Sequence, residues 1–189
     1  MASLKTACLM IRMGYTFRSR FEPDSQGNVR VIQMRDIDAR HRIDEAALER
    51  WSLDAVKPSL LVREGDLLLQ SRGYSNTAAL VPPGLDKVIA SAPLMVIRAD
   101  QKKLLPEYLR WFLNHPQTQV RMTQNATGTS VRLISKAQLE DLELPLPPLK
   151  KQRRIAAVAE LAEREQAILD AITSMRKAYL EEVLMRRAR

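Results

Sequence analysis

The last forty residues of the chain constrain its fold most, because they predict one long helix. Between Lys150 and Arg187 there is no glycine and no proline, the two residues that most often break helices. At a rise of about 1.5 Å per residue, this helix would be about 55 Å long. A lone helix of that length cannot bury its apolar side by itself. We therefore expect a compact domain that carries a helical arm for dimerisation or docking.

The apolar residues of this helix follow a heptad pattern. Two series recur every seven residues, Leu161, Ile168 and Met175 in one, and Val158, Ile172 and Tyr179 in the other. Glu165 interrupts the second series, so the pattern is typical of a short coiled-coil seam with one polar layer. The stripe could instead pack on the chain's own domain, but that domain would be shorter than the helix. We predict that these six apolar residues form a dimerisation surface.

Composition bounds the class of protein. The 189 residues are 46% hydrophobic and 28% charged, which is typical of a globular domain with an appendage. No apolar run reaches the about 18 residues of a membrane span, and the N-terminus lacks the pattern of a signal peptide. A single cysteine, Cys8, excludes an internal disulfide and a cysteine-cluster metal site. We therefore expect a cytoplasmic protein without a membrane partner.

The chain is basic along its whole length. The formal net charge is +8, and residues 150–189, with ten Lys/Arg and six Asp/Glu, contribute half of it. A basic domain favours a polyanionic partner, and nucleic acid is the commonest one. A soluble protein can also be basic without such a partner, so charge alone leaves both interpretations open.

The residues before the tail predict a β-rich body with long loops. Apolar and alternating segments predict five short strands, at residues 29–34, 60–62, 67–70, 87–90 and 94–98. We expect the second and third strands to flank a tight turn at Gly65-Asp66, and the last two to form another pair.

Helix signals follow these strands. Pro106 suits the first turn of a helix, and Pro116 interrupts the apolar face that follows it. Ser135 and Gln138 fit a capping box, in which each side chain bonds to the backbone N–H of the other residue. Together with the strands, these helices make the predicted fold class α+β.

Catalytic motifs are scarce. The histidines, His41 and His115, have no metal-ligand partner at helical spacing, and the six glycines are wrongly spaced for a phosphate-binding loop. Gly-x-Ser-x-Gly, a Pro-Pro-aromatic methyltransferase motif and a nuclease-type carboxylate pair are also absent. We therefore expect no catalytic residue, no metal and no cofactor, and a protein that is not an enzyme.

Three polar loops are better suited to binding. They span residues 14–20, 70–76 and 124–132, and they combine arginine with Ser, Thr, Asn or Gln, which contact phosphates and base edges in DNA. Each loop alone is better explained as an ordinary turn, but three of them in a basic chain without catalytic motifs favour DNA. The candidate DNA-binding residues are Arg18, Arg20, Arg72, Tyr74, Ser75, Asn76, Gln124, Asn125, Thr127, Thr129 and Arg132.

The end of the body resembles a known family. The sequence GTSVRLIS at residues 128–135 precedes LELPLPPLKKQRRIA at residues 142–156. This order closely resembles the end of a target recognition domain in the specificity subunits of type I restriction-modification enzymes. Gly14-Tyr15-Thr16-Phe17 and Gly65-Asp66-Leu67-Leu68 resemble the family's recurrent segments near the domain start and middle. The resemblance covers nearly the whole chain and implies sequence-specific binding to double-stranded DNA.

The resemblance also implies an organisation. The familiar subunit has two recognition domains and two conserved helices, whereas this chain resembles a half-subunit. It would consist of a β-rich target recognition domain at 1–144, a proline-rich hinge at 145–149 and a long coiled-coil spacer or dimerisation helix at 150–189. We expect a homodimer whose two-fold symmetry is mirrored in an interrupted palindromic target. The family further implies a partner DNA methyltransferase and, in some systems, a restriction subunit.

Two other functions fit the same residues. One is a stand-alone DNA-binding regulator that works without a methyltransferase. The other is an adaptor that docks a protein complex and does not bind DNA, or an inactive remnant. The start of the helix leaves a similar choice between partner or DNA-backbone contacts and a solvated basic face, for Lys150, Lys151, Gln152, Arg153 and Arg154.

Overall fold

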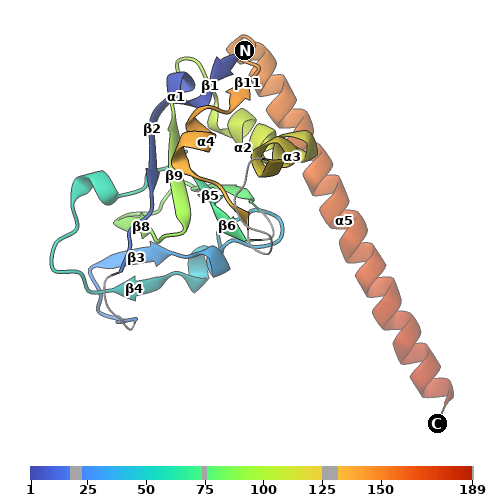
Figure 1. Ribbon diagram of the computed structural model, residues 1–189. Coiled ribbons are helices and arrows are strands. Elements are labelled where there is room, and N and C mark those ends of the chain that lie inside the picture. The colour runs from blue at the N-terminus through green and yellow to red at the C-terminus, as the bar shows by residue number, and fades with distance from the viewer. Residues whose placement is uncertain (18–22, 74–75, 125–131, 189) are drawn as a thin grey trace. The chain divides into compact units, whose positions relative to one another are not determined.

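The computed structural model describes residues 1–17, 23–73, 76–124 and 132–188 (Figure 1). The chain divides into two compact units, Met1–Arg153 and Arg154–Arg189. The first unit contains the strands and short helices, and the second contains most of the long C-terminal helix. The α+β class and the long helix predicted from the sequence are thereby confirmed.

The centre of the first unit is a four-stranded antiparallel sheet. Its order is β2 (Cys8–Met13), β9 (Leu94–Ala99), β5 (Leu67–Gln70) and β7 (Ala78–Leu80). In β5, the side chains of Leu67, Leu68 and Leu69 are all fully buried. A strand covered on both faces has no polar alternation, which explains why β5 begins with three leucines and β9 with four apolar residues in a row.

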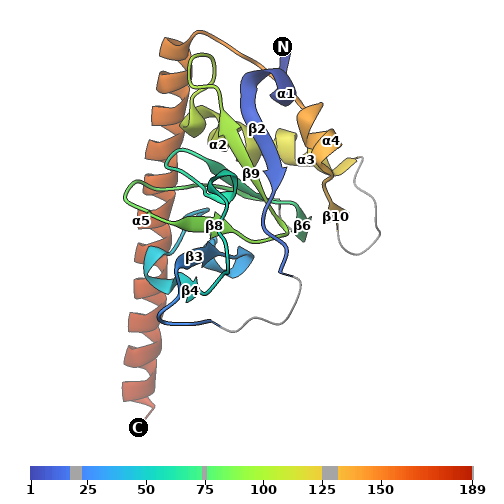
Figure 2. The same cartoon turned by 90° about the vertical axis from the view of Figure 1, so that its left-hand side faces the viewer.

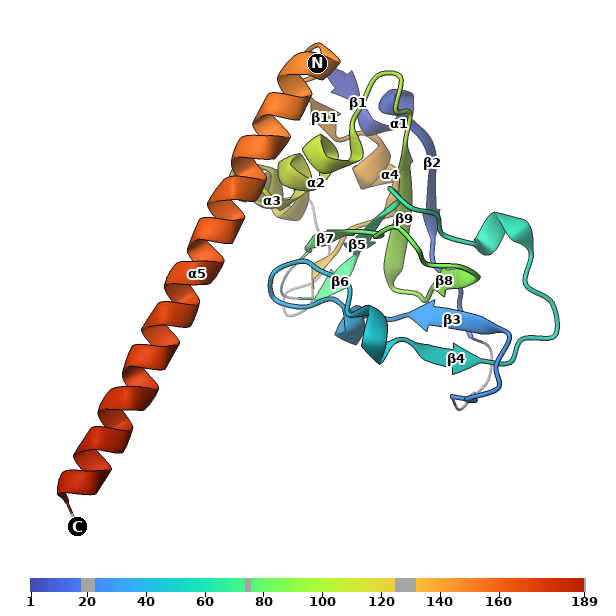
Figure 3. The ribbon, with the colours of Figure 1, turned by 180° about the vertical axis from the view of Figure 1, so that it is seen from behind.

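A second sheet of three strands contains β4 (Glu49–Trp51), β3 (Val29–Ile32) and β8 (Val88–Ala90). β3 is antiparallel to β4 and parallel to β8. Figures 2 and 3 show this sheet at the end of the unit opposite the N-terminus. The strand expected at 29–34 ends at Ile32, because a 3₁₀ turn, η1 (Met34–Asp36), follows it. Asp36 stabilises the start of this turn, since its side chain accepts the Gln33 N–H at 2.7 Å.

Two expected strand pairings are wrong. Residues 60–62 form no strand, because Pro58 fixes φ at the start of a 3₁₀ turn, η3 (Pro58–Leu60), and only Leu61 makes an isolated bridge, to Ile89. Strands β8 and β9 both exist, but they lie in different sheets instead of pairing with each other. An apolar run thus predicts a strand but not which other strand it pairs with.

The helices of the first unit follow the local signals more closely. They are α1 (Leu4–Ala7), α2 (Pro106–Asn114), α3 (Pro116–Gln124) and α4 (Lys136–Glu140), with a 3₁₀ turn, η2, at Glu45–Ala47. Pro106 begins α2, as predicted, and α2 ends at Asn114, before the interruption expected at Pro116. Pro116 also begins a further helix, α3, that the sequence analysis did not predict. The capping box is confirmed, since Ser135 N donates to Gln138 Oε1 at 2.8 Å and Gln138 N donates to Ser135 Oγ at 3.2 Å.

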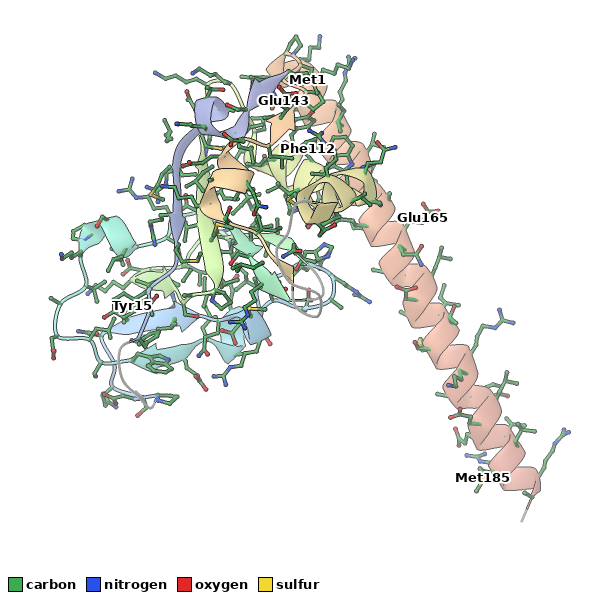
Figure 4. All side chains as sticks on the ribbon, in the orientation of Figure 1. Met1, Tyr15, Phe112, Glu143, Glu165 and Met185 are labelled. Carbon is green, nitrogen blue, oxygen red and sulfur yellow. The ribbon has the colours of Figure 1, made fainter. Side chains whose placement is uncertain are left out.

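The N-terminus pairs with the segment that leads to the hinge. β1 (Ala2–Ser3) is antiparallel to β11 (Glu143–Leu144), with Ala2 opposite Leu144. Figure 4 labels Met1 and Glu143 next to each other at this end of the unit. The two ends of the body are therefore closed by backbone hydrogen bonds before the long helix begins.

A buried ion pair joins the start of β5 to β9. Arg98 Nε and Nη2 donate to the two carboxylate oxygens of Asp66, each at 2.7 Å, and Asp66 is 1% exposed. Asp66 Oδ2 also accepts the Arg63 N–H at 2.8 Å. The hydrogen bonds between Arg98 and the Asp66 carboxylate raise the pKa of the Arg98 guanidinium. The aspartate of the Gly65-Asp66 turn is thus a structural residue that fixes the turn to the sheet.

The first turn of α5 (Leu149–Arg187) belongs to the first unit. Gln152 is fully buried. Its Oε1 accepts the Leu105 N–H at 2.9 Å, and its Nε2 donates to the carbonyls of Lys103 and Pro147 at 2.7 and 2.8 Å. Gln152 is therefore not part of a solvated or partner-binding face, unlike its exposed neighbours Lys150, Lys151, Arg153 and Arg154.

The heptad residues of α5 are exposed. Their exposed fractions range from 46% for Ile172 to 67% for Val158. Pairs of opposite charge four residues apart, such as Arg164 with Glu160 and Arg186 with Glu182, lie along the same helix. Such pairs stabilise an isolated helix by only about 0.2–0.5 kcal/mol each. The helix has an apolar seam without a partner within its own unit, and a partner helix remains a prediction.

Candidate nucleic-acid interface

A short strand pair joins two of the three polar loops predicted from the sequence. β6 (Arg72–Gly73) is antiparallel to β10 (Arg132–Leu133), with Gly73 opposite Arg132 and Arg72 opposite Leu133. Gly73 has a φ of +138°, which residues with a side chain rarely adopt. The pair places the 70–76 loop against the end of the 124–132 loop (Figure 1), and the Arg72 side chain is exposed there.

Ser71 fixes the base of this strand pair. It is fully buried, and both its N–H and its Oγ donate to the carbonyl of Pro93, at 3.2 and 2.5 Å. Its own carbonyl accepts the Ile134 N–H at 2.8 Å. Three segments far apart in the sequence therefore meet at one serine, directly before Arg72.

Asn76 has a different place from the one that the sequence suggested. We expected it among the DNA-binding residues, but its side chain is 1% exposed. Its Nδ2 donates to the carbonyl of Gln70 at 2.9 Å and so closes the loop from within. The buried amide cannot reach a ligand on the surface in this conformation, so its part in any interface is to shape the loop.

Two amide side chains from helices bond to the end of this loop and to the strand that follows it, and no sequence pattern indicated either of them. Asn114, at the end of α2, accepts the Ala78 N–H and donates to the Ala78 carbonyl, each at 2.8 Å. Gln119, in α3, donates to the carbonyl of Asn76 at 2.9 Å. Asparagine and glutamine near helix ends are common, so only the three-dimensional arrangement identifies these contacts.

The described residues of the first predicted loop, 14–17, lie beside strands β8 and β9. Gly14 N donates to the Leu94 carbonyl and Tyr15 N to the Ala90 carbonyl, each at 2.7 Å. The ring of Phe17 packs between those of Tyr15 and Trp51, at centroid distances of 4.9 and 4.8 Å. A Cβ on Gly14 would lie 2.6 Å from the Ala90 carbonyl oxygen, so the close approach requires glycine. These residues serve packing, and Figure 4 labels Tyr15 in this part of the unit.

The remaining predicted site residues are only partly described. Gln124 ends α3 and Arg132 begins β10, and the structure gives their backbone position. Seven further candidates lie outside the described residues: Arg18, Arg20, Tyr74, Ser75, Asn125, Thr127 and Thr129. The structure therefore places the bases of the two joined loops.

A hairpin that was not among the predicted loops adds two exposed arginines. Ile37 and Ile43 are buried and form an isolated antiparallel bridge. At the tip, Asp38 Oδ1 accepts the backbone N–H groups of Arg40 and Arg42, each at 2.8 Å. Acidic residues such as Asp38 flank these arginines, so the segment as a whole is not basic and its charge did not indicate a binding loop.

Other parts of the described structure offer little chemistry. A cavity of about 360 Å³ lies at the Gly65-Asp66 end of β5, the end away from Gln70, and residues of both charges line it, among them Arg63, Asp66 and Lys102. Within the described ranges, no group of three or more His, Cys, Asp or Glu residues could hold a metal ion. Nor is any helix in this part of the chain long and apolar enough to cross a membrane.

Comparison with known families identifies the class. The model of the type I restriction modification DNA specificity domain matches residues 9–173, and the chain belongs to this family. A Methanocaldococcus jannaschii protein, named for the specificity subunit of the type I restriction enzyme MjaX, is 27% identical over 109 residues. The match covers 56% of this chain and 25% of that protein.

Solved structures agree in fold. The HsdS subunit from Thermoanaerobacter tengcongensis is 26% identical, with a TM-score of 0.66 over 93% of this chain and 45% of that one. A chain solved in work on complex assembly and conformational transition of the type I restriction-modification system is 25% identical, with a TM-score of 0.71 and the same coverage. A third structure, the S subunit from M. genitalium, is 14% identical with a TM-score of 0.58 and shows the fold alone. This chain spans less than half the length of each relative.

Proposed function

We propose that this chain recognises a specific sequence in double-stranded DNA and gives a partner DNA methyltransferase its target, without catalytic activity of its own. The observation that carries the proposal is the family match over residues 9–173, combined with the β6–β10 pair that joins the bases of two polar loops. A net charge of +8 supports it, because basic proteins gain affinity for DNA by releasing counterions.

The proposed interface consists of the two joined loops. Arg72 is exposed at their junction, and arginine binds both phosphates and guanine edges. We place the remaining contacts on the residues that flank this junction or lie in the loops, namely Tyr74, Ser75, Gln124, Asn125, Thr127, Thr129 and Arg132. Arg18 and Arg20 remain candidates for a second contact with the DNA backbone, and Asn76 has a shaping role inside the loop.

We propose further that α5 pairs with the α5 of a second copy in antiparallel orientation. Six exposed apolar residues at heptad spacing support this, because such a seam is stable in water only when a second helix covers it. A two-fold dimer would present two identical domains in opposite orientations. Its target would then be two inverted half-sites separated by unread bases.

The exposed apolar surface of α5 is wider than this seam. Leu169, Leu180 and Leu184 lie outside both heptad series and are 50–66% exposed. A two-stranded coiled coil covers mainly two of every seven positions, so a dimer alone would leave these leucines in water. We propose that the methyltransferase subunit covers them and, in systems that have one, that a restriction subunit joins the same complex.

The test of this function is a methylation assay. The methyltransferase subunit of the same system is incubated with DNA and a methyl donor, with and without this chain. We expect site-specific adenine methylation only in the presence of the chain, at an interrupted palindrome. The same site-specific methylation in its absence would contradict the targeting role, and methyl transfer by the chain alone would contradict the absence of catalytic activity.

A further inference from the structure

The two loops of the proposed interface are connected a second time, away from the β6–β10 pair. Gln119 lies in α3, the helix that leads into the 124–132 loop, and its Nε2 donates to the carbonyl of Asn76 at 2.9 Å. Asn76 is the last residue of the 70–76 loop. The same Nε2 donates to the Leu113 carbonyl at 2.6 Å, at the end of α2. One side chain therefore joins the end of one loop to the helix before the other.

Asn114 fixes the corner between α2 and α3 to the sheet. Strand β7 lies at the edge of the four-stranded sheet, so the outward N–H and carbonyl of Ala78 have no neighbouring strand. The Asn114 amide takes the place of a strand, because its Oδ1 and Nδ2 bond to these two groups at 2.8 Å each. Ala78 follows Asn76 by two residues, so the corner is attached directly beside the end of the loop.

We propose that Asn114 and Gln119 are positioning residues for DNA recognition. They fix Asn76, at the end of the 70–76 loop, relative to α3, the helix before the 124–132 loop, so that the bases of the two loops keep one arrangement. Neither residue needs to touch DNA, since Oδ1 and Nδ2 of Asn114 and Nε2 of Gln119 already form hydrogen bonds inside the protein. Base readout depends on atoms held in place before binding, because each loop that must be ordered on binding reduces the affinity. The inference rests on the proposed function.

Two substitutions separate this role from a general loss of structure. Gln119→Leu removes the donor while keeping a side chain of similar size. Asn114→Asp keeps the acceptor for the Ala78 N–H but sets a carboxylate oxygen against the Ala78 carbonyl. The matched control is Gln117→Leu, which changes an exposed glutamine of the same helix. Trp fluorescence and circular dichroism of the full-length chain verify that each variant is folded.

The main readout is the ratio of specific to non-specific binding. The target is selected from random-sequence DNA with the wild-type protein, and binding is measured over a range of salt concentrations. We expect each variant to bind the target about tenfold more weakly, as the loss of one or two hydrogen bonds would allow. Non-specific affinity and the salt slope should be unchanged, because the phosphate contacts remain. Wild-type target affinity in both folded variants, or an equal loss on all sequences, would overturn the proposal.

A second readout does not depend on DNA. Amide hydrogen exchange is measured in the free protein over residues 70–78, where we expect faster exchange in Gln119→Leu than in wild type or Gln117→Leu. If the wild type binds no specific DNA, the proposed function fails, while this exchange result still decides whether the amide contacts hold the loop. Unchanged exchange in both Gln119→Leu and Asn114→Asp would overturn the positioning role by itself.

Discussion

Leu68 in β5 is fully buried, whereas Leu161 in α5 is 63% exposed. The same contrast holds across the two units of the chain. In residues 1–153, apolar side chains of strands and short helices cover one another, and even the carboxylate of Asp66, which pairs with Arg98, is buried. In α5, the single buried residue is Gln152, and it lies in the first unit. The body contains its own core, whereas the apolar surface of the helix is exposed.

This difference has a thermodynamic consequence. The stability of the body is a property of the folded chain, because its buried area does not depend on concentration. The stability of a helix that pairs with another molecule rises with the concentration of that molecule. The same kind of substitution should therefore change the stability of the body when it is made in the first unit, and change association when it is made in the helix.

The largest expected effect is on association through the helix. Changing Ile168 and Ile172 together to Asp places two charges in the proposed seam, and a buried charge without a partner costs about 3–5 kcal/mol. We expect the double variant to be monomeric at concentrations where the wild type is dimeric, while its body stays folded. Light scattering measures the mass of both proteins, alone and with the methyltransferase.

The control for this variant carries the same added charge on the other side of the helix. Ala167 and Ser174 lie seven residues apart and outside both heptad series, so Ala167→Asp with Ser174→Asp should leave the dimer intact. A wild-type chain that is monomeric alone and in the complex would remove the basis of the dimer proposal.

The next effect concerns the same substitution in both units. Leu68→Ala should destabilise the body by about 2–5 kcal/mol, because it removes a buried side chain and leaves a cavity. Leu161→Ala should change the stability of the body by less than about 0.5 kcal/mol. Urea unfolding is followed by tryptophan fluorescence, since both tryptophans, Trp51 and Trp111, lie in the first unit. Equal losses in the two variants would mean that the helix contributes to the core of the body.

The smallest effect is on chemical reactivity, with no change of stability. Burial, and secondarily the charge of Asp100, raises the pKa of the Cys8 thiol to about 12. The thiolate is the reactive form, so Cys8 should react slowly with iodoacetamide at pH 8 and faster as the pH rises toward 12. A cysteine introduced by Ser174→Cys, on the exposed face of α5, should react at the rate of an ordinary thiol. Mass spectrometry of tryptic peptides measures both rates, and rapid labelling of Cys8 in the folded chain would contradict its burial.

The sequence predicted those features that depend on neighbouring residues. The capping box at Ser135, the helix start at Pro106 and the long helix are all local, and all are present. Strand partners are not local, because the parallel pair of β3 and β8 joins residues that are far apart in the chain. An apolar run indicates burial but does not say which strand lies beside it.

The candidate site shows the same limit. Loop composition indicated the segments 70–76 and 124–132, but their contact arises from the pairing of Arg72 with Leu133 across sixty residues. Asn76 was predicted on its polar side chain and is buried. Asn114 and Gln119 had no signal at all, because a side-chain amide that bonds to a distant backbone looks like any other amide in a sequence.

Gln152 belongs to the helix by its position in the chain and to the body by its hydrogen bonds. Any exchange of recognition domains between related proteins has to respect this double membership. A joint placed in the proline-rich segment at 145–149 would separate Gln152 from Lys103 and Leu105, and a chimera would keep these bonds only if the incoming helix supplied an amide at the same place. A joint after Arg153 transfers the domain together with the glutamine that its own backbone requires.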